Sequence, residues 1–496
     1  MEFVCNFPFF SIMVSMFSGV ISSVLKGKKA RNLGVAVNGI VIVLSAATLA
    51  YVMSTGESFV YTMGHYTAPW GNEIRVGVLE ALTATFFSFV MLLSVLGGMK
   101  HLSRELEDRS LGMYFLFLNL MLGAILALIY TNDIFTAYVF IEINTIAACG
   151  LIMVRKTGPV YVAATRYMIM SLMGSGLFLI GVCILYTVTG HLLMPNIQES
   201  VKMLMLRGEY HIPLLMVIIL ITAGLAIKSG LYPFHSWMPA AYGFSLPSSS
   251  AILSGLVSKS YIFLLIKIIY RVVGKDTILG SDIIKVLFAF SVFAIILGSV
   301  GAIREKDIRY MNAYSSVAQI GYVYMGIGLG SRAGMVAAMF HILVHAATKS
   351  LLFISAEGLS QASGHTYRIQ ELKGAGYRSR LAGIGFTVGA FSLVGIPLFG
   401  GFISKISFAV AATEDPRKVV LVFIVIAIST LLNAIYFVRT VIIIYTPAAA
   451  SEKSRRVKLG AAGCTAITVF AAVNFILGLF SGPFIGAIKQ GIAMFQ

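Results

Sequence analysis

Charged residues and cysteines are both scarce in this sequence. Only 11% of its 496 residues are charged, against 58% that are hydrophobic, which excludes an ordinary soluble globular protein. The four cysteines, Cys5, Cys149, Cys183 and Cys464, are isolated and form no C-x-x-C spacing. The absence of this spacing argues against an iron–sulfur cluster and a structural zinc site, so we expect buried, inert thiols.

Motifs for a bound cofactor are also missing. The glycine-rich stretch GIGLGSRAG at 326–334 has no strand before it, so it does not read as a nucleotide-binding loop. His235, His341 and His345 have no acidic partner that would make them metal ligands, and such histidines are often simply satisfied core residues. We expect neither a cofactor nor a metal on this chain, and therefore no redox or hydrolytic chemistry of its own.

Long apolar runs dominate the sequence instead. Runs of about 20 residues, the length that crosses a bilayer core of about 30 Å, recur from end to end. The apolar start lacks an early basic segment, so we interpret it as an anchor rather than a cleaved signal. The runs predict an all-α polytopic membrane protein with about fourteen transmembrane helices, near residues 4–25, 34–53, 77–99, 111–130, 132–153, 162–188, 213–243, 247–270, 277–301, 311–330, 335–356, 381–412, 418–445 and 459–480.

Basic residues outnumber acidic ones by 37 to 20, yet they do not gather in one patch as nucleic-acid binding would require. They recur in alternate loops between the apolar runs. By the positive-inside rule these loops are cytoplasmic, and an even number of spans then places both termini outside the cell membrane. The partner indicated is the lipid bilayer, not nucleic acid. The basic loops lie near residues 26–31, 100–109, 155–156, 304–309, 368–380 and 453–458.

Four charged residues lie near the middle of apolar runs. By helical rise, Glu142 is about 15 Å, Lys228 about 22 Å and Lys259 about 18 Å into a core of about 30 Å. Lys405 follows a Gly/Pro break in its span. A charge at this depth costs a few kcal/mol, so each is a candidate functional residue. The alternatives are a static ion-pair network and, for Lys259, a side chain that snorkels to the membrane surface.

Helix breakers interrupt two of the spans. Gly230 and Pro233 follow Lys228 in the seventh span, and VGIPLFGGFISK interrupts the twelfth before Lys405. Interrupted spans in corresponding places mark transporter repeats and the ion path between them. If each repeat has five spans, the two interrupted spans are each the fourth span of their repeat. Because five is an odd number, the second repeat must cross the membrane in the opposite orientation to the first. We therefore expect N-terminal helices in 1–110, inverted repeats at 111–270 and 277–445, and a C-terminal helix in 446–496.

Lysine and glutamate in these positions permit proton transfer. Burial disfavours the charged form of a lysine, whereas a nearby carboxylate favours it. A movable Glu142 could therefore make Lys228 hold or release a proton, a role closed to arginine, which stays protonated in proteins. We expect Lys228, Lys259 and Lys405 to form a relay bridged by water and by histidines such as His345. His235, beside the first break, is a further candidate.

The stretches that carry these residues resemble the proton-translocating antiporter-like subunits of respiratory complex I, Mrp-type Na⁺/H⁺ antiporters and membrane-bound energy-converting hydrogenases. The resemblance spans roughly residues 75–445. It rests on YTNDIFTAYVFIEI, AIKSGLYPFHSWMPAAY, PSSSAILSGLVSK, EKDIRYMNAYSSVAQIGY, HILVHAATKSLLF and GIPLFGGFISK.

The resemblance implies roles for particular residues. Glu80 stands where relatives have an aspartate near the third span, and MPAAY replaces their LPDAH, with Ala240 in place of the acid. Lys405, together with GHYTAPWGNEIRVGVLEAL, is similar to the Mrp D-type branch. The family's translocation residues correspond to Glu142, Lys228, Lys259, Lys405, His345 and Lys349.

The implied function is proton translocation in a redox-driven complex, such as an energy-converting hydrogenase or a complex I-like NADH dehydrogenase. The redox module and the other membrane subunits would then be separate chains. The alternative is the D-type component of a multisubunit Na⁺/H⁺ antiporter, in which sodium ions move as well as protons. A membrane scaffold, whose charges only hold helices together, is a third interpretation.

Overall fold

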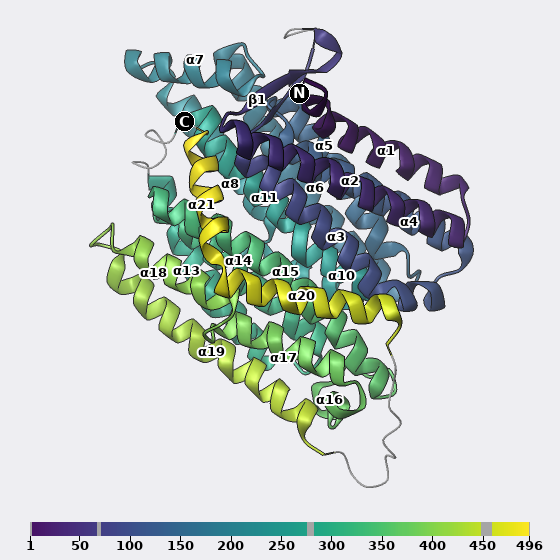
Figure 1. Cartoon of the computed structure of the whole chain (residues 1–496). Helices are drawn as coiled ribbons and strands as arrows, with labels where there is room; N and C mark the ends of the chain where they lie inside the picture. Colours follow the sequence, from purple (N-terminus) through teal and green to yellow (C-terminus); the bar gives the residue numbers. More distant parts are fainter. Residues whose placement is uncertain (1, 67–70, 275–281, 448–458, 496) are drawn as a thin grey trace.

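The computed structural model describes residues 2–66, 71–274, 282–447 and 459–495. It is a bundle of long tilted helices, and both chain ends lie at the end of the bundle that carries α7 and the strand β1 (Figure 1). Twelve helical segments in these ranges are long and apolar enough to cross a membrane. The prediction of an all-α polytopic membrane protein is confirmed at this level.

The twelve segments follow the apolar runs closely. Two of them are composite, because His211–Phe244 holds α8 (His211–Ser229), the 3₁₀ turn η3 (Phe234–Trp237) and α9 (Met238–Phe244), while Pro247–Val273 holds α10 (Pro247–Ile252), the π-helix η4 (Leu253–Val257), α11 (Ser258–Ile268) and the π-helix η5 (Ile269–Val273). The others are α1 (Phe7–Val24, preceded by the 3₁₀ turn η1 at Glu2–Asn6), α2 (Lys28–Thr55), α3 (Val78–Glu105), α4 (Asp108–Tyr130), α5 (Ile134–Met153), α6 (Gly158–Thr189), α13 (Asp282–Arg304), α15 (Arg332–Ala362), α19 (Val419–Tyr445) and α20 (Ala461–Leu479).

Two of the fourteen expected runs differ from the prediction. The run near 311–330 is a helix, α14 (Ile308–Gly328), but it is not among the twelve apolar spans. Its polar side chains, such as Asn312 and Gln319, are buried against other helices instead of facing lipid. The run at 381–412 forms two shorter helices, α17 (Arg380–Val394) and α18 (Gly400–Ala412).

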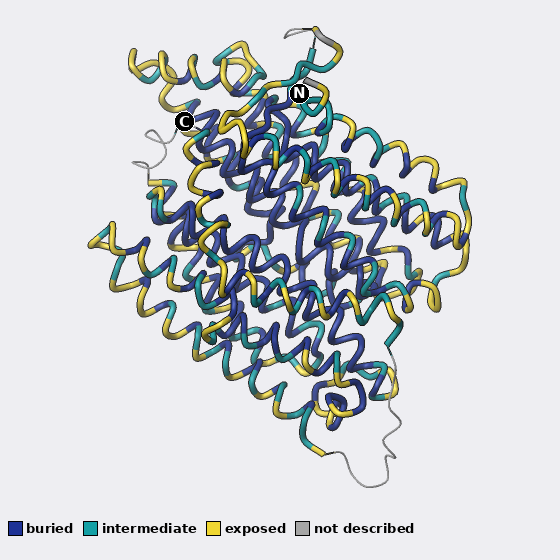
Figure 2. Tube along the Cα trace, in the orientation of Figure 1, coloured by how far each residue is buried: buried dark blue, intermediate teal, exposed yellow. Residues whose placement is uncertain are grey.

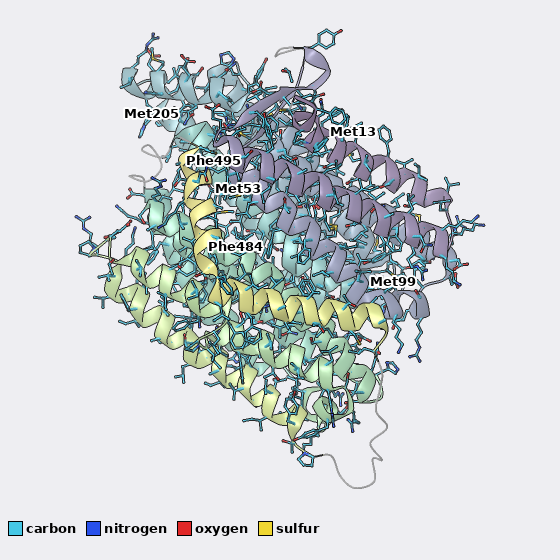
Figure 3. The ribbon with its side chains drawn as sticks, viewed as in Figure 1. Met13, Met53, Met99, Met205, Phe484 and Phe495 are labelled. Atoms are coloured by element: carbon cyan, nitrogen blue, oxygen red, sulfur yellow. The ribbon has the colours of Figure 1, made fainter. Side chains whose placement is uncertain are left out.

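Several elements were not expected from the apolar runs. The helix α7 (Met194–Arg207) buries one face through Met194, Ile197 and Val201, and α21 (Ser481–Ala493) follows α20. Met205 on α7 and Phe484 on α21 are labelled in Figure 3. The remaining elements are short: β1 (Phe59–Thr62) pairs antiparallel with β2 (Glu73–Val76), and the turns are η2 (Met63–His65), η6 (Ile369–Leu372) and α16 (Ala375–Arg378).

The most deeply buried segments are Pro247–Val273 and α15. Every residue of the first is buried, as is nearly all of α15, whereas α1 and α19 are exposed along one side (Figure 2). These two central segments carry buried lysines and histidines. Other helices surround them, so these polar groups are kept away from lipid.

Two turns of the bundle are built alike. Asp133 caps α5 by accepting a hydrogen bond from the Thr136 N–H, and Asp307 caps α14 by accepting one from the Arg309 N–H. Each aspartate also forms an isolated β-bridge, Asp133 with Leu193 after α6 and Asp307 with Arg368 after α15. The turn after α4 and the turn after α13 are therefore fixed by the same combination of contacts.

Candidate functional site

Lys228 lies one residue before the end of α8. The helix stops because Gly230 adopts a left-handed conformation with φ of 75°, which glycine tolerates without strain. The Gly230 N–H bonds to the Ile227 carbonyl at 3.1 Å and the Leu231 N–H to the Ala226 carbonyl at 3.0 Å, which closes the last turn. The Lys228 side chain is only 1% exposed, and its Nζ donates to Thr145 Oγ1 on α5 at 2.6 Å.

Glu142 is on α5, one turn before Thr145, and is half-buried. Its Oε1 atom is buried and has no hydrogen-bond partner in the described part of the chain. Glu142 lies within electrostatic range of Lys228 but does not form an ion pair with it. The two groups are therefore coupled through space while Thr145 holds the lysine amine.

Lys259 is fully buried near the start of α11, directly after the π-helix η4. Its Nζ donates to the carbonyl of Ser254, five residues back within that turn. The Ser254 hydroxyl lies 2.9 Å from the hydroxyl of Ser316 on α14. A π-helical turn disturbs the regular i to i−4 ladder, and here it offers a carbonyl to the lysine.

His341, His345 and Lys349 lie four residues apart on α15 and so share one face of it. The two imidazole rings stack at a centroid distance of 5.8 Å, and His341 Nδ1 lies 2.7 Å from the hydroxyl of Ser404 on α18. Lys259 is within electrostatic range of all three residues. The histidines therefore lie between Lys259 on α11 and Ser404 on α18.

Lys349 is anchored to α14. Its Nζ donates to the Asn312 carbonyl at 2.8 Å and also to the Ser315 hydroxyl. The two ring nitrogens of His345, four residues away, have no protein partner within the described ranges. Buried polar atoms of this kind are normally met by ordered water in native proteins.

Lys405 lies beyond the break between α17 and α18. Helix α17 ends at Val394 because Gly395 has φ of 90°, and the Gly395 N–H bonds to the Ser392 carbonyl at 3.1 Å. The Lys405 Nζ donates to the Val394 carbonyl at 2.7 Å and to Thr430 Oγ1 on α19 at 2.8 Å. Lys405 is thus buried and caps the C-terminus of α17.

His235 is the one predicted site residue that lies apart from the others. It is half-buried in η3, stacks on Tyr232 at 5.3 Å and meets Tyr314 edge-on at 6.3 Å. Its Nδ1 is buried and lacks a partner among the described residues. None of these contacts reaches Lys228, so the geometry leaves His235 beside the break but outside the line of lysines.

The residues between the lysines add further hydrogen-bonding atoms. Both polar atoms of the Asn144 and Asn312 side chains are buried without a partner in the described structure, as are the Tyr322 hydroxyl and the Gln319 amide nitrogen. With His345, these unpartnered groups lie on α5, α14 and α15. Such groups can hold a chain of hydrogen-bonded water, the medium that proton transfer requires.

A family comparison matches the part of the chain that holds all of these residues. Residues 131–432, more than half of the sequence, match the model for the transmembrane part of the NADH:quinone oxidoreductase/Mrp antiporter proteins. The chain belongs to this family. Glu142, Lys228, Lys259, Lys349 and Lys405 of this antiporter-like protein all lie within the matched segment.

Two curated relatives illustrate the breadth of the family. The N subunit of the NADH-quinone oxidoreductase of Desulforudis audaxviator is 30% identical over 462 residues, which cover 91% of this chain and 90% of that protein. The D subunit of the Na⁺/H⁺ antiporter of Alkalihalophilus pseudofirmus is 26% identical over 362 residues, which cover 73% of this chain and 71% of that protein.

Two solved structures share the fold. A chain of the membrane-bound sulfane sulfur reductase, an archaeal respiratory membrane complex, has a TM-score of 0.88 and 25% identity, covering 100% of this chain and 98% of that one. A chain of the Mrp complex from Dietzia sp. DQ12-45-1b has a TM-score of 0.87 and 22% identity, covering 99% and 97%. The antiporter-like protein is therefore a multi-pass membrane protein whose fold recurs in multisubunit complexes.

A second group of buried charges was missed in the sequence. Lys267 is fully buried on α11, where its Nζ donates to the carbonyls of Ile129 and, at 2.8 Å, Thr131 at the end of α4. Arg271 donates to Asn132 Oδ1 at 2.6 Å, and Arg75 forms an ion pair with Glu80 at 3.4 Å. The signal was available, since Lys267 lies eight residues after Lys259 in the same apolar run.

The other missed group joins the N-terminal helices to α15. His101 on α3 lies 2.9 Å from Glu357 on α15 and 3.1 Å from Glu105, which in turn pairs with Arg155 at 3.2 Å. The sequence gives no sign of the contact with α15, because its two partners are far apart along the chain. In the described ranges, no cluster of three or more His, Cys, Asp or Glu side chains is placed to hold a metal ion.

Proposed function

We propose that this antiporter-like protein moves protons across the membrane in a redox-driven complex, through Glu142, Lys228, Lys259 and Lys405. The observation that carries the proposal is the set of buried lysines and histidines on α8, α11, α15 and α18. Lys259 lies within electrostatic range of both histidines, and Lys405 within range of His341. A scaffold would not require titratable groups without hydrogen-bond partners in this set.

The proposed step at Lys228 uses the geometry around Thr145. A lysine amine in an apolar interior is stabilised when it loses its charge, and a carboxylate within electrostatic range opposes this loss. A change in the position or charge of Glu142 therefore shifts the proton occupancy of Lys228. The released proton passes toward Lys259 and then to the histidines of α15, with Lys405 as the exit-side residue.

The proposal includes two inverted repeats at 111–270 and 277–445, after N-terminal helices in 1–110 and before a C-terminal segment in 446–496. The matching caps and bridges of Asp133 and Asp307 support it. The ends of α8 and α17 support it too, because the same kind of hydrogen bond closes both. The Ile396 N–H bonds to the Phe391 carbonyl at 3.0 Å, and the Leu231 N–H bonds to the Ala226 carbonyl at 3.0 Å. On this arrangement the basic loops are cytoplasmic and both termini lie outside.

The second candidate function is that of the D-type component of a multisubunit Na⁺/H⁺ antiporter. It has equal support, because the relatives include both the N subunit of a NADH-quinone oxidoreductase and the D subunit of an antiporter. In either case we propose that the chain works with other membrane proteins of one complex, and in the first case with a redox module on separate chains. The chains that co-purify with the native protein distinguish the two.

The test of translocation is Glu142→Gln in the purified complex, reconstituted in proteoliposomes. The amide keeps the shape of the side chain but carries no charge to act on Lys228, so we expect assembly to be normal and coupled proton flux to fall by at least about tenfold. Glu414→Gln, at an exposed position near the end of α18, is the matched control. Normal flux in Glu142→Gln would remove the glutamate from the mechanism.

A further inference from the structure

A polar pocket of about 810 Å³ opens where α13, α14 and α19 end or begin at the basic face. The turn after α13 forms one wall, Arg439 on α19 forms another, and the segment around η6 forms the third. The residues that line it are Ile303, Arg304, Glu305, Lys306, Asp307, Tyr310, Arg368, Ile369, Gln370, Glu371 and Arg439.

Most of the acidic side chains in this pocket are already paired. Asp307 forms an ion pair with Arg309 at 2.9 Å, and Glu371 lies 3.6 Å from Arg368 and accepts a hydrogen bond from Thr366. By contrast, the side chains of Arg304, Lys306 and Arg439 are exposed and form no ion pair or hydrogen bond with any described residue. Three free cations of the described structure therefore face a pocket in which Glu305 is the remaining unpaired carboxylate.

Arg439 also lies on an exposed apolar stripe of α19. Along one side of α19, Leu431 is 64% exposed, Ile435 43% and Ile442 62%, at spacings of three to four residues that place them with Arg439. The stripe offers aliphatic contact next to the cations. A ligand that binds here can be anionic at one end and apolar along the rest.

We propose that this pocket binds an anionic phospholipid, with its phosphate held by Arg304, Lys306 and Arg439 and its acyl chains along the α19 stripe. Basic pockets between transmembrane helices at the cytoplasmic level are suited to such headgroups, and guanidinium groups bind phosphate oxygens in a bidentate manner. A soluble phosphate compound would use the same cations but would gain nothing from the stripe.

The experiment measures phospholipid binding to the purified full-length protein, in nanodiscs that contain phosphatidylglycerol diluted in phosphatidylcholine. Neutralising the pocket with Arg304→Gln, Lys306→Gln and Arg439→Gln together should weaken phosphatidylglycerol binding by at least about tenfold, since each basic residue near an anionic surface contributes. The matched control neutralises Lys26, Lys28 and Lys29, three exposed lysines at the turn between α1 and α2 and in the first residues of α2. Glu305→Gln should strengthen binding.

Three results would overturn the proposal. Equal losses in the pocket and control variants would mean that only the overall charge matters. Competition by glycerol 3-phosphate at concentrations comparable to those of the lipid would assign the pocket to a soluble ligand. Absence of bound phosphatidylglycerol from the intact native complex would indicate that a neighbouring chain covers the stripe. The thermal stability of the triple variant, measured beside the control, detects misfolding.

Discussion

Thr145 Oγ1 accepts a hydrogen bond of 2.6 Å from the Nζ of Lys228, and it does so from the helical turn that follows Glu142. The contact joins α5 to the end of α8, across 83 residues of sequence. It fixes the lysine amine near Glu142 without allowing the two charges to touch. Thr145 therefore holds Lys228 at the end of α8 in a position where the charge of Glu142 on α5 can act on it.

The substitution Lys228→Arg tests whether Lys228 carries a proton. Arginine keeps a positive charge and hydrogen-bond donors for Thr145, but it does not release its proton, so translocation should fall by at least about tenfold while the complex assembles. Proton flux in proteoliposomes and the composition of the complex are the measurements. Lys418→Arg is the control, since Lys418 also donates to a helix end, the Gly328 carbonyl at 3.1 Å, but lies outside the relay. Near-normal flux in Lys228→Arg would make the lysine structural.

The substitution Thr145→Val tests the hydrogen bond itself. Valine has nearly the same shape but removes the acceptor, and a hydrogen bond to a charged group contributes about 1.5–3 kcal/mol. We expect lower thermal stability and slower proton flux, with Thr145→Ser close to the wild type because the serine hydroxyl can accept the same bond. If valine and serine behave alike, the amine of Lys228 does not depend on this contact.

The sequence was informative about where two of the helices end. The ends of α8 and α17 follow from Gly230 and Gly395. The depth of Glu142, Lys228 and Lys259 in the membrane rests on helical rise and stays a prediction. The family match covers Glu142, Lys228, Lys259 and Lys405, the residues of the proposed relay. These features depend on local sequence, so they can be read without knowing how the helices pack.

Contacts between distant helices could not be read in this way. Thr145 is one of many threonines, and nothing in the sequence marks it as the acceptor for Lys228. The helix α14 falls short of the twelve apolar spans because it carries polar side chains such as Asn312 and Gln319, and hydropathy cannot register that other helices cover them. The amphipathic helix α7 was missed because it has no apolar run of membrane length.

The two glycines at the breaks provide the last prediction. Both have positive φ, 75° at Gly230 and 90° at Gly395, and alanine in the left-handed region costs roughly 1–2 kcal/mol. A Cβ at Gly395 would also come within 2.9 Å of Lys405 Cδ, and a Cβ at Gly230 within 2.5 Å of the Met238 side chain. We therefore expect Gly230→Ala and Gly395→Ala to lower thermal stability and to displace the lysines beside them.

Gly176→Ala is the matched control for these substitutions. Gly176 lies in α6 without a positive φ, and a Cβ there would meet no atom within 4 Å. Alanine should be neutral or slightly stabilising at this position, because it favours the helix by up to about 1 kcal/mol. The comparison of proton flux is decisive: if Gly395→Ala loses stability but keeps normal flux per assembled complex, the break holds the helices together and does not position Lys405 for proton transfer.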